Sequence, residues 1–202
     1  MKKTTAKAMK EERTKKAADK LSPIYAWSRY VFGIDPGLKG GIACVDNLTG
    51  TVTLARPTPT QTDAVSGKPT YDVNEMHLIL SLCKNYPEEC SVVIERQQAM
   101  PKQGVVSMFT TGFGYGIWTA LIALTPIPIS RKYVVRPADW QIILRGEDAK
   151  DDTKAKSIAR VHRVFSGVDL CGGNKLKRTP SDGIADAINI AHYVCLRMVP
   201  PV

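Results

Sequence analysis

Four carboxylates in this 202-residue sequence have the positions needed for metal-dependent chemistry. Asp35 ends a short apolar run, Glu95 follows a Val-Val-Ile run, and Asp182 and Asp186 are four residues apart in an apolar segment. An i, i+4 spacing places two side chains on one face of a helix. Acids that face one another in a partly dry site repel, and divalent cations usually offset that repulsion. We therefore predict a single site built from these four acids.

The donor set of this predicted site indicates an ion and a reaction. All-oxygen ligands favour Mg²⁺, with Mn²⁺ as a substitute, over zinc. Two such ions about 4 Å apart activate a water on one side of a phosphodiester and stabilise the leaving oxygen on the other. We therefore expect two Mg²⁺ ions per site and hydrolytic strand cleavage, with one catalytic and metal-binding set: Asp35, Glu95, Asp182 and Asp186.

Each acid also has a purely structural explanation when it is taken alone. Asp35 lies in an Asp-Pro-Gly turn, Glu95 could be a surface acid at a strand end, and Asp182 could cap a helix. Asp186 is harder to explain in this way, because apolar residues surround it and a carboxylate there needs a partner. The four acids taken together favour the catalytic interpretation.

The segments that must position these acids alternate between strand and helix patterns, which indicates an α/β fold with a mixed five-stranded sheet flanked by helices. Three antiparallel N-terminal strands and two later strands are expected at 30–35, 40–45, 51–55, 91–95 and 133–136. Helices are expected at 72–85, with Asp72 as the cap, and at 107–124, 137–144, 151–165 and 180–197. The segment 56–71 is rich in Pro, Thr and Ser and predicts a loop.

The formal net charge of +9 would attract a polyanion, and the charge is concentrated in two segments. Residues 1–20 and residues 150–180 each contain eight Lys or Arg against three acids. We expect residues 1–28 to form a flexible basic tail, which is either a solvated terminus or a nucleic-acid-binding arm. Residues 29–199 are expected to form one domain, since domains commonly contain about 100–200 residues.

The lack of a membrane span and of a secretory signal, together with the scattered cysteines, indicates an intracellular protein with no membrane partner. No uninterrupted apolar stretch reaches the roughly 18 residues of a membrane span, and the start lacks the apolar core of a secretory signal. The five cysteines are scattered, without a CxxC pair, which favours reduced thiols. The expected location is the cytoplasm or nucleoid. An organelle nucleoid stays open, although the acids of the N-terminal segment fit a transit peptide poorly.

Three motifs resemble those of the RuvC-type Holliday-junction resolvases. Residues 33–37, Gly-Ile-Asp-Pro-Gly, followed by the glycine pair 40–41, are similar to the first motif of the family. Residues 93–95 are similar to its second motif and residues 181–187 to its third, and the resemblance covers roughly residues 30 to 197. The four-residue spacing of the last two acids, the Lys-Gln-Gly of 102–104 and the glycine-rich segment 112–118 resemble its chloroplast and phage branch.

The resemblance implies an RNase H-like fold and a structure-selective endodeoxyribonuclease that cuts opposed strands of a four-way junction. Asp35 would bridge both metals, Glu95 would complete one coordination shell, and Asp182 with Asp186 would complete the other. Because such a junction has approximate two-fold symmetry, a C2 homodimer would supply matching active sites. The glycine-rich helix 107–124 is the candidate interface, with burial inside one subunit as its alternative.

Several basic and polar residues are candidates for contact with DNA. The loop after Glu95 either reads base edges or is an ordinary turn, and the basic segment either follows the phosphate backbone or is a solvated helix face. The candidates are Lys102, Gln103, Gly104, Lys150, Lys154, Lys156, Lys175, Lys177 and Arg178, with Lys154 the first choice for the scissile phosphate. Phe109, Phe113 and Trp118 either stack on bases or pack in the core.

Three other functions remain open at the level of sequence. One is an RNase H-like nuclease acting on another branched or hybrid nucleic acid, because the metal site would look alike. Another is a junction-binding protein that does not cleave, against which the presence of all four acids argues. The third is a sugar-kinase-like ATPase with a phosphate loop at 35–41, but such proteins need a second nucleotide-binding half that 202 residues do not accommodate.

Overall fold

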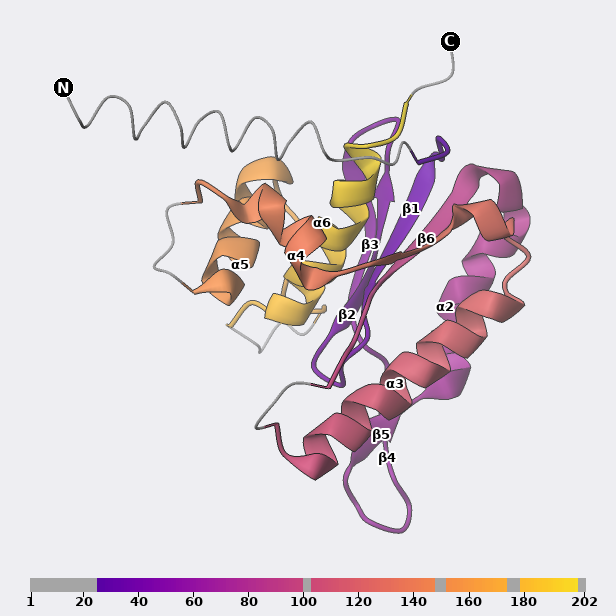
Figure 1. Ribbon diagram of the computed structural model, residues 1–202, viewed down its shortest axis with the longest axis vertical. Coiled ribbons are helices and arrows are strands. Elements are labelled where there is room, and N and C mark those ends of the chain that lie inside the picture. The colour runs from indigo at the N-terminus through magenta and orange to yellow at the C-terminus, as the bar shows by residue number, and fades with distance from the viewer. Residues whose placement is uncertain (1–24, 100–102, 148–151, 174–178, 200–202) are drawn as a thin grey trace, which may run out of the picture.

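A five-stranded sheet forms the centre of the computed structural model, which describes residues 25–99, 103–147, 152–173 and 179–199 (Figure 1). In spatial order its strands are β3 (Thr51–Pro57), β2 (Gly41–Asp46), β1 (Tyr30–Asp35), β6 (Cys90–Glu95) and β7 (Lys132–Val135). The first three strands pair antiparallel, whereas β6 runs parallel to β1 and β7 parallel to β6. The predicted mixed sheet with three antiparallel N-terminal strands is confirmed.

The two central strands determine where chemistry is possible. Strands β1 and β6 carry continuous apolar runs, as expected for strands covered on both faces. They pair in parallel with Ile34 opposite Ile94, so Asp35 and Glu95 follow directly at the same edge of the sheet. The register of one strand pair therefore brings the first two predicted site residues together.

Helices cover both faces of the sheet (Figure 1). One face packs against α6 (Asp182–Cys195), which contacts α5 (Thr153–Val164) and α4 (Pro137–Trp140). The other face packs against α2 (Val73–Ser81) and α3 (Val105–Leu124). Short 3₁₀-helices complete the structure: η1 (Leu82–Asn85), η2 (Pro87–Glu89), η3 (Ile129–Arg131) and η4 (Gln141–Leu144). The predicted helix at 137–144 is therefore α-helical only over its first half.

Polar side chains fix the starts of three helices. Asp72 accepts a hydrogen bond from the backbone N–H of Glu75, which confirms the predicted cap of α2. Asp152 caps α5 and Ser181 caps α6 in the same way. Helix α6 then presents an almost wholly buried run of small and branched apolar residues to the sheet. The position of Asp182 and Asp186 is thus set by the packing of α6 on β1 and β2.

The prediction of a continuous loop at 56–71 is wrong. Strand β3 extends to Pro57, and β4 (Thr60–Thr62) pairs with β5 (Pro69–Tyr71) in a hairpin. Strands of three residues are too short to show an alternating pattern, and the turn residues that join them dominate the composition. Tyr71 anchors the hairpin, because its hydroxyl donates to the backbone carbonyls of Pro36 and Thr110 at 3.4 and 3.3 Å.

Helix α3 is apolar on its open side as well as on its packed side. Of the described helices, it alone is long and apolar enough to meet the length and composition criteria for a membrane span. Here it lies on the sheet through the buried side chains of Trp118, Leu121 and Ile122, so Trp118 is a core residue. Several large apolar side chains remain exposed on it: Val105, Val106, Phe109, Phe113 and Leu124.

The described chain packs onto the sheet from Tyr25, four residues before the predicted start of the domain. Tyr25 bridges to Met198, and Ser28 is fully buried with its hydroxyl 2.6 Å from that of Ser91. Residues 1–24, most of the predicted basic tail, lie outside the described residues. All five cysteines are free thiols and four of them are buried, in agreement with the predicted reduced state.

Candidate active site

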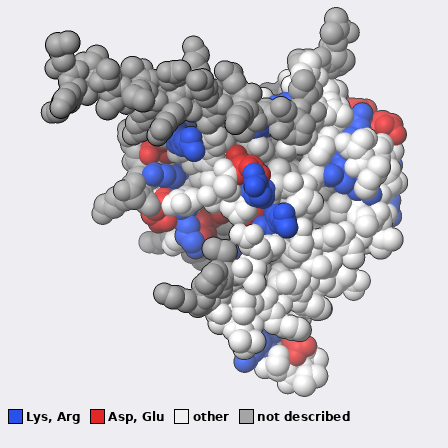
Figure 2. Space-filling view, viewed as in Figure 1, with Lys and Arg blue, Asp and Glu red and all other residues white. Residues whose placement is uncertain are grey.

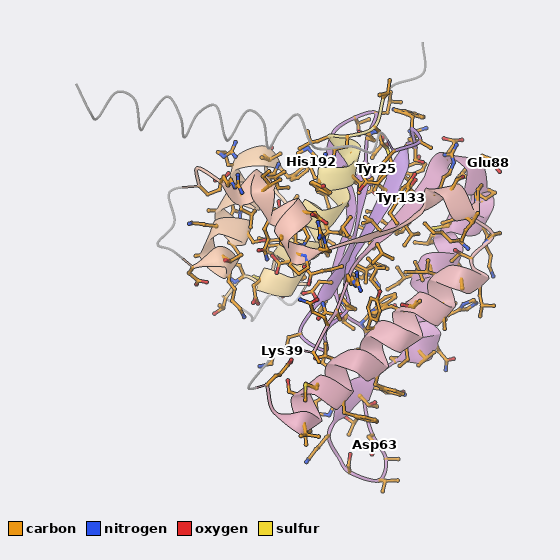
Figure 3. All side chains as sticks on the ribbon, in the orientation of Figure 1. Tyr25, Lys39, Asp63, Glu88, Tyr133 and His192 are labelled. Carbon is orange, nitrogen blue, oxygen red and sulfur yellow. The ribbon has the colours of Figure 1, made fainter. Side chains whose placement is uncertain are left out.

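The four predicted acids come together where β1 and β6 end and α6 begins. The charges of Glu95, Asp182 and Asp186 all act on Asp35, and those of Glu95 and Asp182 act on Asp186. The β1–β2 turn lies at this edge, and in Figure 3 its residue Lys39 is at the same end of the molecule as the hairpin residue Asp63. One strand pair and one helix terminus therefore define a common acidic site.

A close backbone contact brings Asp35 beside the start of α6. The turn after Asp35 closes with a 2.9 Å hydrogen bond from Gly40 N–H to the Gly37 carbonyl. Gly183, in the first turn of α6, packs directly on this turn, and a Cβ at position 183 would lie 2.2 Å from the carbonyl oxygen of Lys39. A residue with a side chain at position 183 would push α6, and with it Asp182, away from Asp35.

Asp35 and Asp186 are in an environment that opposes their ionisation. Burial first, and then the charges of the other acids, raise the pKa of Asp35 to about 8. Burial likewise raises the pKa of Asp186 to about 7, although a hydrogen bond from Ser157 opposes the shift. Asp186 Oδ1 is buried and has no hydrogen-bond partner. A cation between these acids would remove the repulsion and satisfy this oxygen.

Glu95 is held on both carboxylate oxygens. The indole N–H of the buried Trp140 donates to Oε2 at 2.5 Å, and the amide of Gln97 donates to Oε1 at 2.9 Å. Burial still raises the pKa of Glu95, and these two hydrogen bonds oppose the rise. This contact of Trp140 with a candidate site residue was missed by the sequence reasoning.

Asp182 differs from the other acids because it has a cationic partner. Lys154 of α5 places its Nζ 2.5 Å from Asp182 Oδ2, and about a third of the Asp182 side chain is exposed. Burial alone would raise the pKa of Asp182, but the hydrogen bond and charge of Lys154 lower it on balance. Lys154, the first choice among the predicted phosphate-binding lysines, therefore lies within the acidic site.

The donor chemistry fits a hard divalent cation. Carboxylate oxygens are the ligands that Mg²⁺ and Mn²⁺ prefer, and the unpartnered Asp186 oxygen leaves a ligand free. Within the described part of the chain, no three His, Cys, Asp or Glu side chains already form a closed ion-binding group. The acids fit the ion in type and location, and their side chains would have to move together to enclose it.

The remaining predicted DNA contacts are only partly within the described residues. Gln103 and Gly104 precede α3, and Gln103 lines a small pocket together with Gln97 and Tyr115. Lys156 lies on α5, next to the buried Ser157. Five predicted contacts lie outside the described residues: Lys102, Lys150, Lys175, Lys177 and Arg178.

Comparison with solved structures shows which fold this is. The yeast mitochondrial Holliday junction resolvase Ydc2 matches with a TM-score of 0.52 and 17% identity, over 86% of this chain and 80% of that chain. The chain has the fold of this yeast resolvase. The predicted RNase H-like fold is thereby confirmed, while the predicted chloroplast and phage branch stays a prediction.

Another solved structure also matches the chain, whereas two sequence comparisons find no match. RuvC of T. thermophilus in complex with a Holliday junction substrate matches with a TM-score of 0.47 and 19% identity, over 81% of this chain and 90% of that chain. No protein-family model and no curated protein sequence matches the chain. The likeness to the fold of the yeast resolvase is visible in the structure at 17% identity, where the sequence comparisons find nothing.

Proposed function

We propose that this protein is a Mg²⁺-dependent endodeoxyribonuclease that resolves four-way DNA junctions by paired cuts on opposed strands. The observation that carries the proposal is the meeting of Asp35, Glu95, Asp182 and Asp186 at one sheet edge of a resolvase fold. Both the donor type and the unpartnered oxygen of Asp186 support metal-dependent hydrolysis of a phosphodiester.

In this proposal, Asp35, Glu95, Asp182 and Asp186 would together hold two Mg²⁺ ions. Bound Mg²⁺ supplies positive charge that activates water and stabilises the leaving oxygen. Trp140 would orient Glu95 by holding Oε2, together with Gln97 at Oε1. The close contact between α6 and the β1–β2 turn fixes the backbone positions from which these acids project.

Lys154 is proposed to exchange partners during binding. Its Nζ neutralises Asp182 in the structure. In the metal-loaded protein Asp182 would bind the cation, and the Lys154 ammonium would then be available to a phosphate of the DNA. The free-energy cost of this movement is small, because 71% of the Lys154 side chain is accessible to solvent. Lys154 would then hold the scissile phosphate against the metal site.

Recognition of DNA is proposed to divide between two segments. The segment that follows Glu95 would read base edges through Lys102, Gln103 and Gly104, because it comes directly after a strand that ends at the site. The basic segment would follow the phosphate backbone through Lys150, Lys156, Lys175, Lys177 and Arg178. Changing the loop should alter the preferred cut site, whereas changing the basic segment should weaken binding to all sequences.

We further propose a homodimer in which α3 is the interface. Its open side exposes Phe109 and Phe113, stacked with ring centroids 6.2 Å apart, and the surface over α3 is largely uncharged (Figure 2). Gly114 is explained by its contact with the Tyr71 ring, whereas a Cβ at Gly112 or Gly116 would meet nothing within 4 Å. Exposed apolar patches of this kind mark interaction sites, and two open glycines would let a partner helix approach closely. A soluble dimer acting on DNA fits the predicted location in the cytoplasm or nucleoid.

The proposal is tested by incubating the protein with Mg²⁺ and a mobile four-way junction, beside a linear duplex, a splayed arm and an RNA–DNA hybrid of matched sequence. Paired symmetric nicks in the junction alone are expected. Equal cutting of all substrates would reject junction selectivity while keeping a metal-dependent nuclease. Junction binding without cutting, with Mg²⁺ or Mn²⁺ present, would favour the non-cleaving junction-binding protein.

A further inference from the structure

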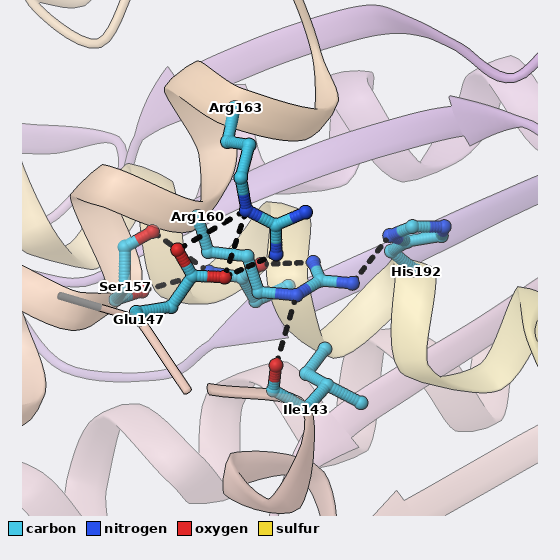
Figure 4. Close-up of polar contacts among 7 residues, drawn as sticks. Ile143, Glu147, Ser157, Arg160, Arg163 and His192 are labelled. Carbon is cyan, nitrogen blue, oxygen red and sulfur yellow. Dashed lines mark hydrogen bonds and ion pairs between the residues drawn. The ribbon is translucent and has the colours of Figure 1, made fainter. Parts of the chain in front are cut away.

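A buried chain of polar side chains leads from the interior to the acidic site. Arg160 of α5 is only 5% exposed, and Ser157 of α5 and Asn189 of α6 are fully buried. Figure 4 shows these contacts together with the neighbouring ion pair of Glu147 and Arg163. Buried polar groups of this kind are costly unless each one is satisfied, so their arrangement calls for an explanation.

Arg160 sets the direction of this chain of hydrogen bonds. A guanidinium has only donors, so its three neighbours must accept: the Ile143 carbonyl at 3.2 Å, Asn189 Oδ1 at 2.7 Å and His192 Nδ1 at 3.1 Å. His192 can accept at Nδ1 because burial and the charge of Arg160 lower its pKa to about 4 and keep the ring neutral. The Asn189 amide is thereby fixed with its oxygen toward Arg160.

The amide of Asn189 passes the direction on to Ser157. With Oδ1 occupied, Nδ2 faces α5 and donates to Ser157 Oγ at 2.9 Å and to the Ser157 carbonyl at 3.1 Å. The Ser157 oxygen is then an acceptor, and its single hydroxyl hydrogen is left to donate elsewhere. The carboxylate of Asp186 lies close enough to this hydroxyl for Ser157 to lower its pKa. Each group in the sequence therefore donates toward the acidic site.

The chain of donors ends on one oxygen of Asp186 and leaves the other free. Asp186 Oδ1 has no hydrogen-bond partner, which leaves Oδ2 as the oxygen on which the Ser157 hydroxyl would act. A carboxylate held at one oxygen by a fixed donor cannot rotate freely, so Oδ1 keeps one direction. Outer hydrogen-bond partners of this kind orient metal ligands, and their loss typically weakens metal affinity about 10- to 100-fold.

We propose that Arg160, Asn189 and Ser157 are positioning residues that fix Asp186 so that Oδ1 faces the divalent cation. This inference rests on the proposed metal-dependent function of the same site. It assigns Arg160, a residue of the basic segment, to the interior of the site and not to the DNA-binding surface. The positive charge of Arg160 strengthens its hydrogen bond to Asn189, and each hydrogen bond polarises the next.

The test uses the full-length chain without DNA and measures Mn²⁺ binding by isothermal titration calorimetry. Ser157→Ala removes the donor to Asp186, while Asn189 Nδ2 keeps the Ser157 backbone carbonyl. Ser91→Ala is the matched control, because it removes a buried hydroxyl paired with Ser28 at the other end of β6. We expect Ser157→Ala to weaken Mn²⁺ binding at least about tenfold. Ser91→Ala should leave the Mn²⁺ affinity unchanged, even if it lowers the melting temperature as much as Ser157→Ala does.

Two further variants separate positioning from a merely structural role. Asn189→Asp keeps the acceptor for Arg160 but removes the donor to Ser157, so it should weaken Mn²⁺ binding while the chain stays folded in urea titrations. In an Asp186→Asn background, Ser157→Ala should have no additional effect on Mn²⁺ affinity, because its effect acts through that carboxylate.

The outcomes distinguish this inference from the proposed function. Equal Mn²⁺ affinity of the wild type and Ser157→Ala would overturn the positioning role and leave the nuclease proposal standing. The same loss from Ser157→Ala in the presence and absence of the Asp186 carboxylate would also overturn it. If Asp35→Asn and Asp186→Asn each bound Mn²⁺ with the wild-type affinity, the proposed metal site itself would be rejected.

Discussion

Lys154 and Asp182 form an ion pair whose Nζ and Oδ2 atoms lie 2.5 Å apart. The pair joins α5 to the first turn of α6 and gives the two acids of α6 opposite properties. Lys154 lowers the pKa of Asp182 on balance, whereas burial raises the pKa of Asp186, one turn later, to about 7. Asp182, with a lysine beside it, therefore ionises more readily than an ordinary aspartate. Asp186 ionises less readily and needs a nearby cation.

Lys154→Met should reduce the rate of junction cleavage by about 100-fold, because it removes a positive charge beside the reacting phosphate. Its effect on thermal stability should be small, since exposed ion pairs contribute little. Single-turnover cleavage under saturating protein measures the rate directly. Lys84→Met, a change to an exposed lysine in η1, is the control, and equal rates for the two variants would contradict the role given to Lys154.

Trp140→Phe should weaken Mn²⁺ binding about tenfold or more, because Glu95 Oε2 loses the indole donor that orients it. Calorimetric titration with Mn²⁺ measures the change. Trp118→Phe is a closely matched control, since Trp118 is equally buried but its indole nitrogen has no hydrogen-bond partner. Both variants should lose stability through lost packing. A loss of metal affinity in both, or in neither, would count against a specific role for the Trp140 N–H.

Between pH 6.5 and 8.5, the metal-free protein should become less stable as pH rises. The folded-state pKa values of Asp35 and Asp186 are raised to about 8 and about 7, far above the roughly 4 of an unfolded aspartate. Folded protein thus binds protons that unfolded protein has already lost, and this stabilisation disappears as pH passes the folded values. Each such proton changes the free energy of unfolding by at most about 1.4 kcal/mol per pH unit, and the slope decreases as each folded carboxyl ionises.

Thermal melts in EDTA across this window measure the slope. Asp35→Asn should flatten it and raise the melting temperature at pH 8.5, and added Mg²⁺ should stabilise the wild type most at high pH. His192 does not interfere, because its pKa of about 4 makes it destabilising only as pH falls below the roughly 6.5 of an unfolded histidine. Melting temperatures that rise with pH in the wild type would contradict the raised pKa values of Asp35 and Asp186.

Phe109→Glu should convert the proposed dimer into a monomer, since it places a charge in the centre of the exposed apolar side of α3. Light scattering coupled to size exclusion gives the mass of the particle. Leu48→Glu, at an exposed site in the β2–β3 turn, controls for the added charge. A wild-type monomer at micromolar concentration, or a Phe109→Glu dimer, would reject α3 as the interface.

The sequence was sufficient to predict the sheet and the acids it positions. β1 occupies the predicted residues 30–35, and β6 begins one residue before the prediction, because apolar runs flanked by turn residues leave few alternatives. The meeting of Asp35 with Asp182 could be expected from motif resemblance, but its physical cause could not. That cause is the packing of Gly183 on the β1–β2 turn, a contact between segments more than 140 residues apart in the sequence.

Residues that support the acids from outside could not be predicted in the same way. Trp140 reaches Glu95 across 45 positions of the sequence, and no local pattern indicates which acid it meets. Arg160 was counted with the basic segment, although it is buried. Asn189 did carry a signal: it is a polar residue three positions after Asp186 in an otherwise apolar helix, where an amide needs a partner.

The central claim is that these four acids perform metal-dependent cleavage, and Asp35→Asn tests it most directly. Cleavage and binding of one four-way junction are measured in parallel, with Mg²⁺ for cleavage and Ca²⁺ for binding, beside Asp63→Asn as a control in the segment that joins β4 to β5. We expect Asp35→Asn to abolish cleavage and to bind the junction within a few-fold of wild type, because phosphate contacts do not need this acid. Cleavage by Asp35→Asn at the wild-type rate would contradict the assigned site.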